Sequence, residues 1–247
     1  MKNTTSLLAI AIGAAAVLAF TSPLGAQAIY SSGHGDIGAA YDAGEFEPHW
    51  HLHAGAVVDG SPLAADGEFA PNAAAARTSA TRTSPTGLSN IIGVADGSLI
   101  YAAGSSAYQP NLGFGVEELE VDDWSTPITL TLTSSSVPAG AKFALYTTNL
   151  AGTSVVDRIF STFSPGSTDF SNSFTMTPGD HMHFQWGFTE VGTYEFELTW
   201  SGNHSVDGAI STTESFSVQV VPEPSTFALL GLGGALGVWA VCRRRLS

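Results

Sequence analysis

The sequence predicts an all-β protein: an antiparallel β-sandwich, immunoglobulin-like in its C-terminal half, with an N-terminal β-hairpin. Two observations predict this class. Between residues 29 and 221, short runs of alternating apolar residues are separated by Pro, Gly, Ser and Thr, and no long window has helical periodicity. The chain has 247 residues, which is enough to bury a sizeable core. An N-terminal signal helix and a C-terminal transmembrane helix are expected to flank this body.

Residues 1–28 are typical of a secretory signal peptide. Lys2 precedes an apolar run at residues 7–20, and Ala26-Gln27-Ala28 forms an Ala-x-Ala site, so signal peptidase is expected to cut after Ala28. A retained membrane anchor is the alternative. It is disfavoured because the apolar run is short for a membrane-spanning helix.

The first element of the body is a predicted hairpin with Ala43 and Gly44 as its two-residue loop, because glycine supplies the positive φ that such a loop needs. Counting outward gives the register. One side pairs Tyr41 with Phe46, Ala39 with Pro48, Ile37 with Trp50 and Gly35 with Leu52. The other side pairs Ala40 with Glu47, Gly38 with His49, Asp36 with His51 and His34 with His53. The hairpin therefore has one apolar face and one face of histidines.

Two more histidines, His181 and His183, alternate on a later predicted strand beside Asp180. Imidazole is a common ligand of zinc, copper and nickel, and the only cysteine, Cys242, lies outside the body. The metal hypothesis is that these side chains converge on a divalent transition metal, zinc or copper. Its ligands would come from His34, Asp36, His49, His51, His53, His181 and His183. The alternative is a solvated polar edge in which each imidazole bonds to backbone or water.

The remaining body is expected to contain one irregular region and six strands. Residues 63–89 are rich in Ala, Thr, Ser and Pro and are predicted to form a long surface excursion. The predicted strands span residues 126–133, 142–147, 170–176, 181–188, 193–200 and 213–220. Gly192-Thr193-Tyr194 opens a late strand as in immunoglobulin-like sandwiches, where a tyrosine packs at a corner.

The C-terminal segment predicts a transmembrane helix. Residues 226–242 are apolar and uncharged and run directly into Arg243-Arg244-Arg245, which favours a cytoplasmic position for the arginines and an external position for the body. A buried core helix is the alternative. It is disfavoured because no polar residue interrupts the run.

Charge excludes nucleic-acid binding. Four of the eight basic residues lie in the terminal segments, while all 22 acidic residues lie between Asp36 and Glu223. Four basic minus 22 acidic residues gives the body a net charge of −18 with neutral histidines. Such a surface repels nucleic acids and anionic lipids and attracts cations.

The C-terminal tail, residues 222–247, resembles a known sorting signal. Val221-Pro222-Glu223-Pro224-Ser225, one apolar segment and the terminal Arg243, Arg244 and Arg245 resemble the PEP-CTERM sorting signal of exported bacterial proteins, over residues 222–247. The resemblance implies an exosortase substrate. Such a protein is held in the inner membrane before processing and is then displayed on the cell surface or released. The hosts in this family are Gram-negative bacteria that make extracellular polysaccharide, so an exopolysaccharide is an expected partner.

The body, residues 29–221, is similar to the choice-of-anchor M domain, a surface-protein family whose members carry different C-terminal anchors. The resemblance rests on the segments HGDIGAAYDAGEFEPHWHLH, LGFGVEELE and HMHFQWGFTEVGTYEFELTWSG. It is also similar to an actinobacterial surface-anchored repeat, whose pattern falls here on His181, His183, Trp186, Phe188, Gly192, Thr193 and Tyr194. Related proteins often occur beside metal-type transporters, which implies a metal role but no activity.

Three functional classes remain. A non-catalytic surface or matrix protein agrees with the terminal signals and the acidic body. A secreted metal-dependent hydrolase would need a general base, for which the sequence offers only Asp36, Glu45, Glu47 or Asp180. A carbohydrate-binding module would use exposed Trp50, Trp124 or Trp200, which are more typical of a core. The first class is favoured, and no catalytic residue is assigned.

Overall fold

The computed structural model describes residues 27–163 and 172–223. The predicted signal peptide, except for its last two residues, and the predicted transmembrane helix at 226–242 lie outside the described residues. Within the described ranges, no helix is both long and apolar enough to cross a membrane.

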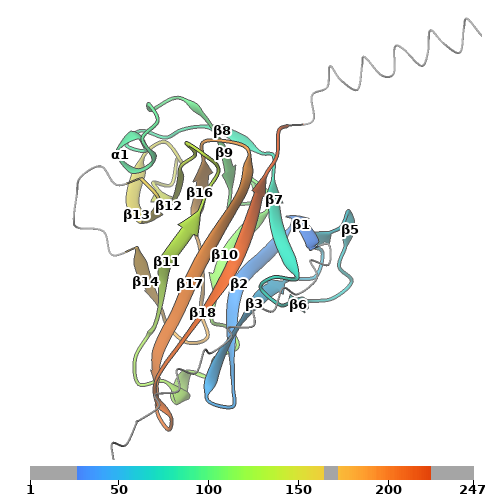
Figure 1. The fold of residues 1–247 in the computed structure, drawn as a ribbon, viewed down its shortest axis with the longest axis vertical. Helices are drawn as coiled ribbons and strands as arrows, with labels where there is room; N and C mark the ends of the chain where they lie inside the picture. Colours follow the sequence, from blue (N-terminus) through green and yellow to red (C-terminus); the bar gives the residue numbers. More distant parts are fainter. Residues whose placement is uncertain (1–26, 164–171, 224–247) are drawn as a thin grey trace, which may run out of the picture.

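The body is all β, as predicted, and contains three sheets that share one core (Figure 1). The eight-stranded sheet has the order β14 (Ser173–Met176), β11 (Ile128–Ser136), β17 (Gly192–His204), β18 (Gly208–Val220), β7 (Ala74–Thr78), β1 (Ala28–Ser32), β4 (Val57–Val58) and β5 (Ser61–Pro62). The histidine sheet has the order β15 (His181–His183), β10 (Asn111–Gly115), β2 (His34–Asp42), β3 (Glu45–Leu52) and β6 (Gly67–Phe69). The β16 sheet has the order β13 (Val155–Ser161), β12 (Phe143–Thr148), β16 (Gln185–Phe188), β9 (Leu99–Ala103) and β8 (Thr81–Thr83). Two short helices, α1 (Ser89–Ile92) and the 3-10 helix η1 (Val121–Asp123), complete the described elements.

The prediction of a fully antiparallel sandwich is wrong in part, because two of the sheets are mixed. Strand β1 pairs in parallel with β7, β7 in parallel with β18, and β2 in parallel with β10. Parallel neighbours need long crossover connections, and local patterning carries no signal for them. The immunoglobulin-like arrangement of the C-terminal half stays a prediction. Tyr194 is fully buried and its hydroxyl donates a hydrogen bond to the Glu190 carbonyl at 2.8 Å, as a tyrosine at a sandwich corner does.

Two segment predictions are also corrected. Residues 63–89 form a surface excursion only in part: residues 63–73 are exposed or half-buried, but β7 lies between β1 and β18, and Ala74, Ala75 and Ala76 are fully buried. Alanine has little strand propensity, which explains why this strand has no clear pattern. The predicted strand at 181–188 is two strands in different sheets: β15 pairs with β10, and after Phe184 the chain continues as β16 between β12 and β9.

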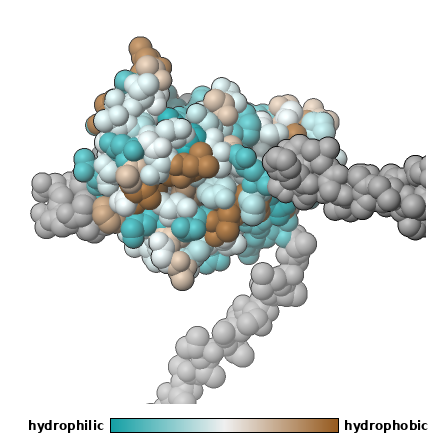
Figure 2. Space-filling model, turned by 90° about the horizontal axis from the view of Figure 1, so that it is seen from above, coloured by the Kyte–Doolittle hydropathy of each residue, from teal (hydrophilic) through white to brown (hydrophobic). Residues whose placement is uncertain are grey.

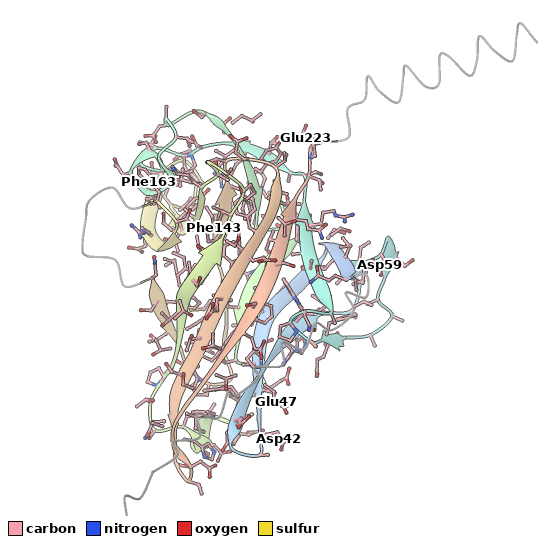
Figure 3. The ribbon with its side chains drawn as sticks, in the orientation of Figure 1. Asp42, Glu47, Asp59, Phe143, Phe163 and Glu223 are labelled. Atoms are coloured by element: carbon pink, nitrogen blue, oxygen red, sulfur yellow. The ribbon has the colours of Figure 1, made fainter. Side chains whose placement is uncertain are left out.

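The core lies where the apolar faces of the three sheets meet. Aromatic pairs join each sheet to the other two, with centroid distances of 5.3 Å for Trp50–Phe216, 4.4 Å for Phe143–Phe196 and 5.5 Å for Phe114–Trp186. The label of Phe143 in Figure 3 marks this interior. Seen from above, the surface is mainly hydrophilic or neutral, and its hydrophobic residues form small separate groups (Figure 2).

The predicted hairpin is present with the predicted loop. Ala43 and Gly44 have φ values of 50° and 94°, and β2 pairs with β3 through Asp36↔His51, Gly38↔His49 and the other counted pairs as far as Gly35↔Leu52. Just beyond this ladder, the His53 amide donates a hydrogen bond to the His34 carbonyl at 3.1 Å. Positive φ at both loop residues is the signature of a type I′ turn. The hairpin end, marked by Asp42 and Glu47 in Figure 3, lies at the opposite end of the molecule from Glu223.

Candidate metal centre

The histidine sheet aligns its polar residues in rows across five strands. One row runs through His183, Gly113, Asp36, His51 and Glu68, each opposite the next on the neighbouring strand. The adjacent row runs through His181, Gly115, Gly38 and His49. Because side chains two apart point to one side of a sheet, both rows lie on the same face. The opposite face of the sheet carries Ile37, Trp50, Leu52, Leu112 and Phe114, all fully buried.

Glycine in β10 lets residues from non-adjacent strands meet. A Cβ atom on Gly113 would lie 2.2 Å from Asp36 Oδ1 and 2.9 Å from His183 Cε1, so no larger residue fits. Because Gly113 has no side chain, side chains from the two strands beside β10 can approach each other over it. Asp36 Oδ1 and His183 Nε2 consequently lie 3.6 Å apart, although β10 separates their strands.

Asp36 is the centre of the first group of side chains. It is fully buried, and its Oδ2 lies 3.3 Å from His34 Nε2 and 3.4 Å from His53 Nε2. Its Oδ1 forms no hydrogen bond with any residue in the described ranges. His183 also contacts His34, with their Nε2 atoms 2.8 Å apart. We call His34, Asp36, His53 and His183 the inner group.

The charge state of the inner group follows from these contacts. Burial opposes ionisation of Asp36, yet the hydrogen bond from His34 and the neighbouring imidazoles hold its pKa below the usual value. The hydrogen bond to Asp36 raises the pKa of His34. Burial lowers the pKa of His183, so this imidazole is kept neutral and available as a ligand.

Glu118 is the centre of a second group. Its Oε1 lies 3.0 Å from His49 Nε2 and 2.8 Å from His51 Nδ1. Glu68 lies opposite His51 in the sheet, and one donor atom from each of these four residues falls within 4.8 Å of the others. We call His49, His51, Glu68 and Glu118 the outer group.

Asp66 lies between the two groups. Its Oδ2 is 3.9 Å from His51 Nε2 and 3.7 Å from His53 Nδ1, and its Oδ1 accepts a hydrogen bond from the Ala54 amide at 2.7 Å. That backbone hydrogen bond lowers the pKa of Asp66. The carboxylate is therefore charged and held behind both imidazoles.

All seven residues predicted as ligands are brought to this one face. His181 is the most exposed of the histidines: its Nδ1 lies 2.8 Å from Glu117 Oε1, and its ring centroid is 5.6 Å from that of His34. Sequence reasoning missed Asp66, Glu68, Glu117 and Glu118. The last two belong to the segment LGFGVEELE, but no local pattern places that segment beside the hairpin.

The spacing of the inner group suits a transition metal. Four ligands about 2.0–2.1 Å from a zinc ion lie about 3.3 Å from one another in a tetrahedron. The distances from Asp36 Oδ2 to the two imidazole nitrogens, 3.3 and 3.4 Å, match that edge. The spacing and donor types of His34, Asp36 and His53 thus fit zinc or copper, whereas calcium and magnesium prefer oxygen ligands. His183 Nε2 faces the other oxygen, Oδ1, and lies 2.8 Å from His34 Nε2, which is shorter than the tetrahedral edge.

The residues suggested for other functions have different surroundings. Trp50 and Trp200 are fully buried and Trp124 is 8% exposed, so none of them offers a face to a sugar. The base candidates Glu45, Glu47 and Asp180 belong to none of the donor groups among the described residues. His204, the remaining histidine, contacts Tyr41 and Asp207 instead.

Comparison with known proteins finds a match for the tail. Residues 220–245 match the family described as the PEP-CTERM protein-sorting motif. No curated protein and no solved structure is significantly similar to the chain. The family match covers the tail alone, so the choice-of-anchor M resemblance of the body stays a prediction.

Proposed function

We propose that this chain is an exported, non-catalytic surface or matrix protein whose body binds a divalent transition metal, zinc or copper. The PEP-CTERM motif at residues 220–245 indicates an exported protein that exosortase processes and that is anchored in the membrane before processing. Display on the cell surface and release into a polysaccharide matrix are both consistent with this motif. The acidic, cysteine-free body agrees with an external location.

The observation that carries the metal proposal is the environment of Asp36. A fully buried carboxylate whose Oδ1 forms no hydrogen bond in the described ranges is costly, unless a cation compensates it. Three imidazoles contact this carboxylate at 3.3–3.6 Å. A solvated polar edge, the alternative, gives no reason to bury the acid among histidines.

The non-catalytic part of the proposal is supported by the surroundings of the base candidates. Glu45, Glu47 and Asp180 belong to none of the donor groups among the described residues, so none of them lies beside the ion as a general base. We further propose the immunoglobulin-like arrangement and the choice-of-anchor M relationship for the body. The support for them is the Tyr194 corner and the quoted sequence segments.

Metal analysis of the purified full chain tests the function. After dialysis against a weak chelator, we expect bound zinc or copper, and added zinc should raise the melting temperature, because an ion that binds only the folded state stabilises it. Asp36→Asn should abolish the part of this increase in melting temperature that comes from zinc at the inner group. Asp122→Asn, at an exposed carboxylate on η1, is the matched control. Absence of bound metal together with an unchanged melting temperature would exclude the proposal.

A further inference from the structure

We infer that the histidine sheet holds two metal ions in separate centres, one in the inner group and one in the outer group. This inference rests on the proposed function and deepens it. The inner centre would use His34, Asp36 and His53, with His183 at its edge. The outer centre would use His49, His51 and Glu118, with Glu68 at its edge.

Distance separates the two centres. Two ligands of one zinc ion lie at most about 4.2 Å apart, twice the bond length. Among the donor atoms that come within 4.8 Å of one another, His49 and Glu118 gather with His51 and Glu68 and with no member of the inner group. One ion therefore cannot collect all of these ligands.

The tautomer of His49 points to a cation in the outer group. Its Nδ1 lies 2.9 Å from the Glu47 carbonyl oxygen, which only accepts, so Nδ1 carries the proton. In the neutral ring the other nitrogen, Nε2, then has a lone pair, and it faces the Glu118 carboxylate at 3.0 Å. Two acceptors at this distance repel each other, so a positive charge must lie with them, which is either a proton on Nε2 or a metal ion. A backbone-bonded Nδ1 with Nε2 directed to the ion is the usual arrangement of a metal-bound histidine.

The structure has room for one small ion or one water molecule beside the outer group. A cavity of about 10 Å³ is lined by Asp36, His51, Glu117 and Glu118, with Gly38 and Gly115 among its other lining residues. This volume accommodates about one water molecule or one ion. The glycines leave this space free, since Cβ atoms there would project toward His49 and Asp36.

Asp66 contacts one histidine of each centre, at the ring nitrogen that faces away from the proposed ion. His51 directs Nδ1 to Glu118 and leaves Nε2 toward Asp66, whereas His53 directs Nε2 to Asp36 and leaves Nδ1 toward Asp66. A carboxylate behind a ligating imidazole orients the ring and increases its basicity. We therefore assign Asp66 as a positioning residue shared by both centres.

The two centres should differ in affinity. The inner carboxylate is fully buried, while the side chains of Glu118 and Glu68 reach solvent. Two imidazoles and a buried acid, with a third imidazole at the edge, favour a tightly held ion. The outer ion, with more carboxylate ligands and more water access, should exchange faster.

Zinc titration of the full chain tests the inference. Equilibrium dialysis with elemental analysis should give two zinc ions per chain. Glu118→Gln should leave one zinc ion per chain, bound as tightly as the inner ion of the parent protein. Asp36→Asn should remove this tightly bound ion. Glu120→Gln, a nearby exposed acid outside both groups, is the matched control. Circular dichroism of each zinc-free variant checks that it is folded.

The outcomes are distinguishable. One ion per chain in the parent protein, unaffected by Glu118→Gln, would overturn the two-centre inference and leave the proposed function in place. Three ions would also overturn it, because a further donor group, either His51, His53 and Asp66 or His34, His181 and His183, would then hold an ion. No bound ion would overturn the proposed function as well. Asp66→Asn should weaken both phases at least tenfold while the stoichiometry stays at two.

Discussion

Asp36 and His183 lie on strands separated by β10, yet Asp36 Oδ1 and His183 Nε2 are only 3.6 Å apart, because they meet above Gly113. This contact links the N-terminal hairpin to a segment almost 150 residues later. It also makes the candidate centre depend on a residue that has no functional group.

The first prediction concerns that glycine. Gly113→Ala would place a Cβ 2.2 Å from Asp36 Oδ1, so the carboxylate or β10 must move. We expect the zinc affinity of the inner centre to fall at least tenfold and the free energy of unfolding to fall by about 1–3 kcal/mol. Zinc titration and urea denaturation measure the two effects.

The matched control is Gly115→Ala on the same face of the same strand. There the new Cβ would lie 3.4 Å from Asp36 Cβ, which is an ordinary contact, so the inner ion should be retained. Equal losses in the two variants would show that Gly113 has no special role.

The second prediction concerns the hairpin turn. Gly44→Ala meets no atom within 4 Å, but φ is 94°, so the change should cost about 1 kcal/mol through backbone strain alone. Ala43→Asn should act in the opposite direction and stabilise the fold by about 0.5 kcal/mol, because Asn-Gly is the preferred pair for this turn. The midpoints of chemical denaturation show whether each variant is less or more stable than the parent protein. A stabilising Gly44→Ala would contradict the assigned turn.

The hairpin also shows what the sequence can determine. Once Ala43-Gly44 is identified as the loop, every partner follows by counting, and the separation of Ile37 and Trp50 from Asp36 and His51 confirms the register. Such pairing is local, because the turn brings the strands together. Five of the seven predicted ligands, His34, Asp36, His49, His51 and His53, come from this one unit.

The rest of the site depends on long-range pairing, which carries no local signal. Nothing between residues 111 and 118 indicates that β10 inserts between β2 and β15 and brings Glu118 to His49. The change of sheet at Phe184 is hidden for a similar reason, because both halves of that segment alternate correctly for a strand. The buried strand at 74–78 has no clear sequence signal, because alanine has little strand propensity and its run does not alternate with polar residues.

The third prediction concerns the core beneath the histidine face. Trp50 is fully buried, packs edge-on against Phe216 and donates a hydrogen bond to the Pro71 carbonyl at 3.1 Å. Trp50→Ala should lower the free energy of unfolding by about 3–5 kcal/mol. Because Trp50 lies between His49 and His51 in β3, zinc binding should weaken in parallel with stability. Val206→Ala, at an exposed turn position, is the control and should change neither quantity.

The last prediction concerns the junction between body and tail. Glu223 belongs to the Pro222-Glu223-Pro224 motif, and it also accepts a hydrogen bond from the Thr81 hydroxyl at 2.5 Å. If exosortase reads the motif, Glu223→Gln should leave an unprocessed, longer form in the membrane fraction, which immunoblotting of cell fractions detects. Thr81→Val removes only the contact with the body and should be processed normally. Failure of Thr81→Val with normal processing of Glu223→Gln would instead indicate that docking of the tail on β8 controls cleavage.

The strand β18 reaches this junction directly, since the Val221 amide donates a hydrogen bond to the Thr78 carbonyl at 2.9 Å. The motif consequently starts within about two residues, or roughly 7 Å, of a fixed point on the body, and any enzyme that cuts there must approach the end of the molecule opposite the hairpin turn (Figure 3).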